Sequence, residues 1–303
     1  MHDILLCFSS GACLYSIPER SLMAPAKYIK EHEITFWFSV PSVVSFMNSF
    51  KMLKENSFPA IRCSLFCGEA LTVENAVAWQ KAAPNSLVEN IYGPTEATIA
   101  FTRYKWEKGL GSSEFEKGYV PIGEAFKGLT TEVVDENGDV CALGQTGELL
   151  LGGDQLSPGY WHDAYKTREI FIERSEQGVR SRWYKTGDLV KKSKFGLVFL
   201  GRLDSQVKIN GHRVELGEIE NALRKEADTS FAVAITLPLN SDNATKVVAF
   251  VAQSQKNEMQ IKDRLKLSLA PYMVPQEIHF LDSFPLNANG KIDRKEIAKR
   301  LET

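Results

Sequence analysis

The sequence predicts an α/β protein in two parts. Residues 1–202 are expected to form a parallel sheet with helices plus a β-rich portion, and residues 206–303 a small α+β domain, with a hinge at 203–205. Three changes of pattern lead to this prediction. Short apolar runs alternate with helical segments up to about residue 120, closely spaced turns then separate strands, and the pattern changes again after residue 205. A chain of 303 residues is also long for a single core.

Apolar runs of strand length mark the first part of the chain. Strands are predicted within 33–41, 60–71 and 85–93, and a helix over 72–83. Pro41 closes the first strand, and Thr72 is suited to cap the helix because its hydroxyl can accept from a backbone N–H of the first turn. This order of strand, helix and strand favours a parallel sheet with helices on its faces.

The N-terminal stretch "HDILLCFSSGACLYSIPE" (2–19) has a short apolar centre. No basic region precedes this centre, Asp3 comes early, and the apolar run is too short to span a bilayer. The stretch is therefore predicted to be a buried element, neither a signal peptide nor a membrane span.

Residues 130–153 predict a β-hairpin, with Asn137 and Gly138 in the turn between two apolar strands. The acidic "DENGD" in this turn could suggest a calcium loop. The twelfth position of such a loop holds no glutamate, so the plain hairpin is preferred.

The last hundred residues combine helices and strands. A helix is predicted over 215–226, with Ile219, Ala222 and Leu223 on one face. Strands are predicted at 231–237, 246–252 and 277–281, and a helix over 259–275 that prolines terminate.

Composition excludes several classes of function. A net charge of -2 gives no electrostatic basis for binding nucleic acid or an anionic membrane surface. The five cysteines are odd in number and include no CxxC pair, which favours a reducing cytoplasm over a disulfide framework or a zinc site. The sequence lacks histidines at zinc-ligand spacing, a GxSxG elbow, and the glycine-rich loops GxxxxGK[ST] and GxGxxG.

The segment "YGPTE", from Tyr92 to Glu96, carries groups that suit a nucleotide. Tyr92 offers a flat face for a base, and the Gly-Pro turn presents the hydroxyl of Thr95 and the carboxylate of Glu96 at one point. A hydroxyl can donate to phosphate, and a single carboxylate suits Mg²⁺. The alternative is an ordinary turn at the end of a strand.

Two further segments carry candidate residues. Asp188 in "YKTGD" follows a glycine turn, where a carboxylate can accept both hydroxyls of a ribose. Lys291 in "NANGKIDRK" could bring a mobile positive charge to a phosphate or carboxylate. Either residue, taken alone, could equally be a solvated turn residue.

Five motifs together resemble a known family: "IYGPTEAT", "GELLLGGDQLSPGYW", "YKTGDL", "GRLDSQVKINGHRVELGEIE" and "NGKIDRK". In this order and spacing they are similar to the adenylation domains of nonribosomal peptide synthetases and to D-alanine carrier protein ligases. These belong to the adenylate-forming superfamily. The resemblance spans nearly the whole chain and implies the remainder of a large AMP-binding subdomain (1–202), a hinge and a small C-terminal subdomain (206–303).

The resemblance implies a role for each matching residue. The implied nucleotide-binding positions are Gly68, Asn90, Tyr92, Gly93, Thr95, Asp188 and Arg202. Glu96 matches the magnesium ligand, and Lys291 matches a lysine that acts with Thr95 and Glu96 by neutralising charge between carboxylate and α-phosphate. Asp204 matches the hinge, and Lys208 and Gly211 lie on the face that meets the phosphopantetheine thiol.

The resemblance also implies a pocket for the substrate side chain. The matching positions are Phe38, Leu65, Cys67, Ile91, Ile99 and Ala100, all apolar. An apolar lining favours an apolar side chain, and "LFCGEAL" around Cys67 resembles the D-alanine ligases and favours a small one. Phe38 is bulkier than expected there. The alternative is that these residues only build the core.

The implied reaction joins ATP and an amino acid into aminoacyl-AMP, then forms a thioester on a carrier protein. The family's phosphate loop and its substrate-binding aspartate would lie upstream of Met1, so the chain is expected to be a truncated product, a half that needs a separate N-terminal half, or a piece of a larger synthetase. Since the chain ends soon after Lys291, the carrier is expected to be a separate protein. The alternatives are an enzyme like acyl-CoA ligases, or an inactive nucleotide-binding remnant or interaction module.

Overall fold

The computed structural model describes residues 2–111, 115, 118–176, 179–203, 206–229, 231–238, 244–285 and 292–301. The chain divides into two compact units, Met1–Leu203 and Asp204–Thr303. The predicted mixed α/β class is confirmed.

The first sheet of unit 1 combines parallel and antiparallel strands in the order β1-β2-β3-β4-β5. Its strands are β1 (Phe36–Ser39), β2 (Cys63–Phe66), β3 (Leu87–Tyr92), β4 (Thr102–Lys105) and β5 (Glu124–Ala125). The first three are parallel, whereas β4 and β5 join antiparallel. Each predicted strand is present but shorter than the run that predicted it.

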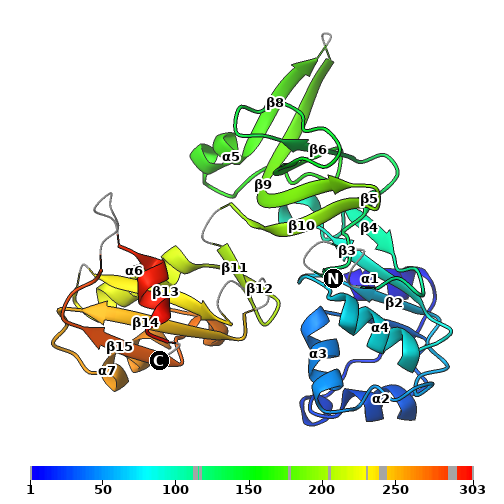
Figure 1. Cartoon of the computed structure of the whole chain (residues 1–303), viewed down its shortest axis with the longest axis horizontal. Coiled ribbons are helices and arrows are strands. Elements are labelled where there is room, and N and C mark those ends of the chain that lie inside the picture. The colour runs from blue at the N-terminus through cyan, green and yellow to red at the C-terminus, as the bar shows by residue number, and fades with distance from the viewer. Residues whose placement is uncertain are drawn as a thin grey trace. The chain divides into compact units, whose positions relative to one another are not determined.

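Two helices connect the parallel strands: α3 (Pro41–Ser49) joins β1 to β2, and α4 (Val73–Ala82) joins β2 to β3 (Figure 1). Before β1 the chain forms α1 (His2–Ser9), the single turn η1 (Glu19–Ser21) and α2 (Pro25–Glu31). Thr72 caps α4 as predicted, because its Oγ1 accepts from the N–H of Asn75 at 3.2 Å. The Asn75 amide also donates to Ser45 Oγ at 2.7 Å and so joins α4 to α3.

Trp79 of α4 is the centre of the core beneath this sheet. It is fully buried and packs on Trp37, Phe58 and Phe66 with ring centroids 5.7, 5.6 and 5.4 Å away. Its indole N–H donates to the Ser64 hydroxyl at 2.8 Å, so the one polar atom of the ring is satisfied. The helix is therefore fixed to the sheet at one point.

The N-terminal stretch is helical but exposed, so the prediction of a buried element was wrong. On α1, Ile4 is 47% exposed, Leu5 62%, Leu6 47% and Phe8 65%. An apolar run indicates which side chains gain from burial, but burial also requires neighbouring elements to cover them. The described elements leave this apolar surface of α1 open.

The second sheet of unit 1 is antiparallel, in the order β10-β9-β7-β6, with β8 paired to β9. Its strands are β6 (Thr130–Val134), β7 (Thr146–Gly152), β8 (Phe171–Glu176), β9 (Val179–Ser193) and β10 (Gly196–Arg202), and α5 (Ala164–Ile170) precedes β8. The predicted turn at Asn137 and Gly138 is confirmed. The second strand starts only at Thr146, because a further turn closed by Gln145 comes first.

Unit 2 is a small α+β domain. A hairpin of β11 (Gln206–Ile209) and β12 (His212–Glu215) leads into α6 (Leu216–Glu226). The sheet β13-β14-β15 follows, with β13 (Ala232–Leu237), β14 (Lys246–Ala252) and β15 (Glu277–Leu281), together with α7 (Glu258–Leu265), η5 (Pro271–Met273) and α8 (Arg294–Lys299). Ile219 and Leu223 are buried, so the predicted apolar face of α6 packs against the core of unit 2.

The predicted helix over 259–275 was too long. A capping box at Asn257 starts α7, which ends at Leu265, and Pro271 begins a separate short turn. Within the described part of the chain, none of the helices has the length and apolar character needed to cross a membrane.

Trp79→Ala is expected to destabilise unit 1 by about 3–5 kcal/mol, because it removes a fully buried ring and leaves a cavity. The matched control is Trp161→Ala, which removes a ring that is 90% exposed and should change stability by less than about 0.5 kcal/mol. Urea unfolding followed by circular dichroism measures both. Equal stability of the two variants would contradict the assignment of Trp79 to the core.

Candidate active site

The connection between β3 and β4 folds back tightly on itself. After Tyr92 and Gly93 the chain makes the single turn η2 (Thr95–Ala97), and then Thr98 and Ile99 adopt left-handed backbone angles, with φ of 57° and 73°. A Cβ on Gly93 would lie 2.5 Å from the carbonyl oxygen of Ile99. Only glycine therefore allows this close return of the chain.

A segment far along the sequence holds this loop. The Gln155 side chain donates to the carbonyl oxygens of Ala97 and Ala100 at 3.2 and 3.0 Å. In return, the Thr98 hydroxyl donates to the Gln155 carbonyl at 2.7 Å. These reciprocal bonds satisfy the backbone of an unusual turn.

Glu96 is half-buried and has a side-chain partner in the same distant segment. The Tyr160 hydroxyl donates to Glu96 Oε1 at 2.7 Å, and the N–H of Ser157 donates to the Glu96 backbone carbonyl at 2.7 Å. Burial, and then the bond to Glu96, raise the pKa of the Tyr160 hydroxyl. This hydroxyl therefore stays protonated and remains a donor at neutral pH.

A buried charged cluster forms where the two sheets of unit 1 meet. Asp188 of β9 accepts from the Tyr92 hydroxyl of β3 on one oxygen and from the Arg202 guanidinium of β10 on the other, at 2.5 Å. The side chains of Asp188 and Arg202 are only 8% and 12% exposed. The Asp188 N–H donates to the hydroxyl of Thr186, which itself donates to the Leu149 carbonyl.

Tyr92 is held as a neutral phenol in this cluster. Burial first, and the adjacent Asp188 carboxylate second, raise its pKa well above the usual value. Both causes oppose a second negative charge beside Asp188, so the tyrosine acts as a fixed hydrogen-bond donor.

Asn90 and Gly68 lie near the ends of β3 and β2. The Asn90 amide is buried and donates to the carbonyls of Val120 and Pro121 at 3.1 and 2.9 Å. Gly68 has a left-handed φ of 93° directly before Glu69, whose buried carboxylate accepts from the N–H of Ser42 at 2.7 Å. In parallel sheets, ligands bind outside the carboxyl ends of the strands, and Gly68 lies just beyond the end of β2, whereas Asn90 lies within β3.

Five of the six predicted pocket residues pack together in one small apolar cluster. They are Phe38, Leu65, Cys67, Ile91 and Ala100, and the cluster also includes Cys63 and Phe126, which the sequence did not indicate. The sixth, Ile99, is half-buried on the left-handed turn and is not part of this cluster.

The remaining predicted site residues belong to unit 2. Lys208 lies in β11, and Gly211 forms a two-residue turn with Asn210, with φ of 82° and 49°. The next residue, His212, stacks flat on the ring of Tyr272, with centroids 3.9 Å apart and an angle of 5°. Asp204 and Lys291 lie outside the residues that the structure describes.

Glu96 fits a magnesium ion bound together with a nucleotide. Mg²⁺ usually takes one or two carboxylates and completes its shell with phosphate oxygens and water. Over the described ranges no three His, Cys, Asp or Glu side chains gather into a metal cage. A single half-buried carboxylate beside a hydroxyl-bearing turn agrees with the first arrangement.

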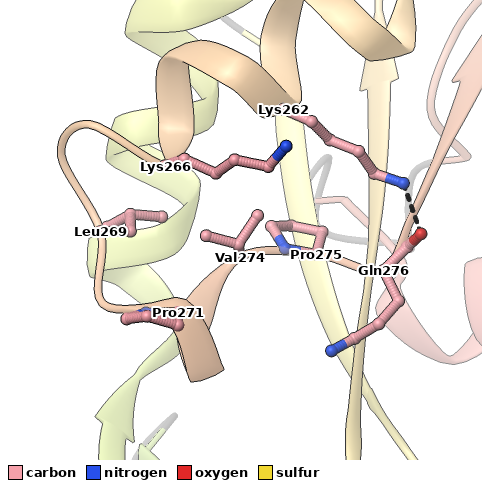
Figure 2. Close-up of a pocket in the computed structure, with 7 residues that line it drawn as sticks. All are labelled: Lys262, Lys266, Leu269, Pro271, Val274, Pro275 and Gln276. Atoms are coloured by element: carbon pink, nitrogen blue, oxygen red, sulfur yellow. Dashed lines mark hydrogen bonds between the residues drawn. The ribbon is translucent and has the colours of Figure 1, made fainter.

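A separate pocket in unit 2 contains none of the predicted site residues (Figure 2). It has a volume of about 430 Å³ and is lined by Lys262, Lys266, Leu269, Pro271, Val274, Pro275 and Gln276. Glu258 pairs with Lys262 at 2.6 Å, and Asp263 pairs with Lys266 at 2.9 Å. Because both lysines are paired with carboxylates, the pocket does not present a concentrated positive charge.

Sequence reasoning missed several residues that build the site. Gln155, Tyr160 and Thr186 act through contacts with residues distant in the sequence, and no local spacing indicates such contacts. The available signal was their position inside the motifs: Gln155 and Tyr160 lie in "GELLLGGDQLSPGYW", and Thr186 lies in "YKTGDL".

Comparison with known proteins places these residues in a family context. The AMP-binding enzyme family matches residues 1–161, and the AMP-binding enzyme C-terminal domain matches residues 218–291. A D-alanine--D-alanyl carrier protein ligase of Lacticaseibacillus rhamnosus is 34% identical over 269 residues, which cover 86% of this chain and 52% of that protein. Bacitracin synthase 1 of Bacillus licheniformis is 32% identical over 300 residues, 98% of this chain and 6% of that protein.

A solved structure agrees with these matches. The Vibrio cholerae adenylation domain AlmE, crystallised in complex with glycyl-adenosine-5′-phosphate, shares 36% identity with a TM-score of 0.88 and covers 99% of this chain and 56% of that one. The chain spans only 52–60% of the length of the D-alanine ligases that it matches. The resemblance to adenylation domains and D-alanine ligases is confirmed.

Tyr92→Phe is expected to make stability less sensitive to alkaline pH. A tyrosine in the unfolded chain ionises at about pH 10, whereas folded Tyr92 keeps its proton. The contribution of Tyr92 to folding stability is therefore complete below about pH 10 and is lost progressively above it. Above the pKa of the unfolded tyrosine, the unfolded chain loses this one proton and the folded chain keeps it. Each further pH unit therefore lowers the free energy of unfolding by about 1.4 kcal/mol. Removing the hydroxyl should make the slope shallower by about that amount.

Urea unfolding at several pH values between about 9 and 11 measures this slope. Tyr165→Phe is the matched control, because Tyr165 is 76% exposed. Removing its hydroxyl should give the same slope as in the unmodified chain. Equal slopes for Tyr92→Phe and the unmodified chain would refute the assignment of a protonated, buried Tyr92.

Proposed function

The chain belongs to the AMP-binding enzyme family, and on this premise we propose that it serves amino-acid activation. In the proposed reaction a small or apolar amino acid and ATP give aminoacyl-AMP and pyrophosphate, and the aminoacyl group then passes to the phosphopantetheine thiol of a carrier protein. This chain supplies the nucleotide-binding residues and the C-terminal domain of the ligase. The observation that carries the proposal is the Tyr92–Asp188–Arg202 cluster next to the Glu96 turn, of which Tyr92 and Glu96 lie within the part matched to the family.

In this proposal the buried cluster binds the nucleoside. Asp188 accepts the ribose hydroxyls, and Arg202 keeps its carboxylate charged and oriented. Tyr92 and Asn90 hold adenine. The Asn90 amide nitrogen already bonds two carbonyls, so the amide oxygen is the group suited to accept from an exocyclic amino group. Gly68 and Gly93 allow the close backbone approach that a nucleotide requires.

The turn after β3 acts on the phosphates. Thr95 donates its hydroxyl to a phosphate oxygen, and Glu96 binds Mg²⁺. The ion, when bound, neutralises negative charge on the phosphates, which is the main demand of this chemistry. The turn is held by Gln155 before any ligand arrives, so little reorganisation is needed at the moment of reaction.

Unit 2 supplies the remaining groups. We place the large subdomain at 1–202, the hinge at 203–205 with Asp204, and the small subdomain at 206–303. Lys291 stabilises the charge that develops between the substrate carboxylate and the α-phosphate, as the family motif implies. Lys208 and Gly211 of the β11–β12 hairpin form the face that meets the carrier thiol during the second step.

The apolar cluster around Leu65 and Cys67 limits the substrate side chain. With Phe38, Ile91 and Ala100 it offers no charged or strongly polar partner, which supports a small apolar amino acid. Ile99 contributes from the adjoining turn. The relatives give the same indication, since one is a D-alanine ligase and one binds a glycyl adenylate.

We propose two protein partners, a carrier protein and a polypeptide with the missing part of the fold. The second proposal is supported by the open apolar side chains of α1 and by the fraction of each relative that this chain spans. The cytoplasm, which supplies ATP, suits the reaction, and all five cysteines are free thiols.

Amino-acid-dependent exchange of pyrophosphate into ATP tests the proposal. The assay uses the 303-residue chain with glycine and a panel of small or apolar D- and L-amino acids. A second series adds, as a separate polypeptide, the part of the Vibrio cholerae domain that this chain does not match. Exchange in either series supports the proposal and names the substrate, whereas silence in both series favours an inactive nucleotide-binding remnant.

Lys291→Ala is expected to lower exchange by roughly 10²-fold, because the charge developing at the phosphate would lose its counter-ion. Lys299→Ala is the matched control, since the Lys299 side chain is 68% exposed and pairs with Glu296 on the same helix. The control should retain full exchange. If both variants behave alike, the role proposed for Lys291 is wrong.

A further inference from the structure

The bond between Tyr160 and Glu96 joins two segments that lie 64 residues apart. Glu96 lies in η2, directly after the Gly-Pro turn, and Tyr160 lies between β7 and α5. The hydroxyl donates to one named carboxylate oxygen, Oε1, at 2.7 Å. A glutamate side chain has three rotatable bonds, so a donor at this position selects one orientation among several.

The Tyr160 ring is itself held in place. It packs edge-on against Phe171 with centroids 5.9 Å apart, and the ammonium of Lys166 lies 4.9 Å from the ring centre. The N–H of Tyr160 donates to the Thr167 hydroxyl at 2.9 Å, which donates to the Asp163 carbonyl at 2.7 Å. The hydroxyl therefore points at Glu96 from a fixed support.

The backbone just before Tyr160 also passes close to Thr167. Gly159 has φ of 146°, and a Cβ there would lie 2.5 Å from Cγ2 of Thr167. Glycine thus lets the chain pass close to Thr167 and deliver Tyr160 to its position. The loop that carries Glu96 is fixed independently, because Gln155 holds its carbonyls and Ser157 its backbone.

We propose that Tyr160 is a positioning residue that orients the Glu96 carboxylate toward the Mg²⁺ of a bound nucleotide. The inference rests on the proposed function and adds a residue to its site. In this proposal, the bond from Tyr160 to Oε1 sets the orientation in which the carboxylate meets the ion. Groups that hydrogen-bond a metal ligand in this way fix its geometry, and losing one typically weakens metal binding by about 10–100-fold.

The Tyr160 hydroxyl could instead serve only to tie two loops together. A purely structural tie would affect nucleotide binding equally with and without the metal, because the whole turn would loosen. A positioning role affects only the part of binding that depends on Mg²⁺. The two roles therefore predict different results for the same variant.

The test is calorimetric titration of ATP into the full chain carrying Tyr160→Phe, once in EDTA and once across a series of Mg²⁺ concentrations. We expect affinity in EDTA to match the unmodified chain, and the Mg²⁺ concentration for half-maximal enhancement to rise by roughly tenfold or more. Tyr165→Phe is the matched control and should behave like the unmodified chain, because Tyr165 is 76% exposed.

Gln155→Leu is the reference variant for a turn that has been loosened. It removes the bonds to the carbonyls of Ala97 and Ala100 and should weaken ATP binding in both conditions. If Tyr160→Phe reproduces that pattern, or leaves the Mg²⁺ dependence unchanged, the inference is overturned. If the unmodified chain binds no ATP even after the separate polypeptide of the exchange assay is added, the proposed function fails as well, which separates the two failures.

Discussion

The structure of unit 1 depends on the pairing of one buried carboxylate. Asp188 joins the second sheet, through β9 and Arg202 of β10, to the first sheet, through Tyr92 at the end of β3. A charge that is removed from water must be paired and hydrogen-bonded, and removing one partner leaves the other at a cost of about 3–5 kcal/mol. The two sheets therefore meet in one arrangement, in which Tyr92 and Ala97 enter the same core as Leu149 and Tyr184.

This arrangement explains why the candidate site residues lie together at the end of β3. Tyr92 belongs both to the charged cluster and to the strand that leads into the Glu96 turn. Fixing Tyr92 therefore also fixes the start of the turn, and Gln155 fixes its end. Groups suited to ribose, base and metal come from segments up to about a hundred residues apart, yet each is held by neighbours that are themselves buried or bonded.

The sequence predicted most of the elements, because they leave local patterns. The Thr72 cap, the Asn137–Gly138 turn and the α6 face follow from spacing within a few residues. Gln155 and Tyr160 were missed, because their function comes from contacts across the fold. The burial of α1 was predicted wrongly for a related reason: an apolar run shows which side chains gain from burial but not which partner covers them. The end of α7 was missed since the prolines lie beyond the true stop at Leu265.

The open side of the first sheet has a consequence for how the purified chain behaves in solution. Among the described strands, β1 forms one edge of the sheet, and its sequence Phe-Trp-Phe-Ser contains no charge and no proline within the strand. Natural edges are usually protected by lysine, proline or a bulge against pairing with another chain. Here the apolar side chains of α1 are open as well. The protein concentration and the presence of mild denaturant or detergent will therefore decide whether a sample stays free of aggregates long enough for its activity to be measured.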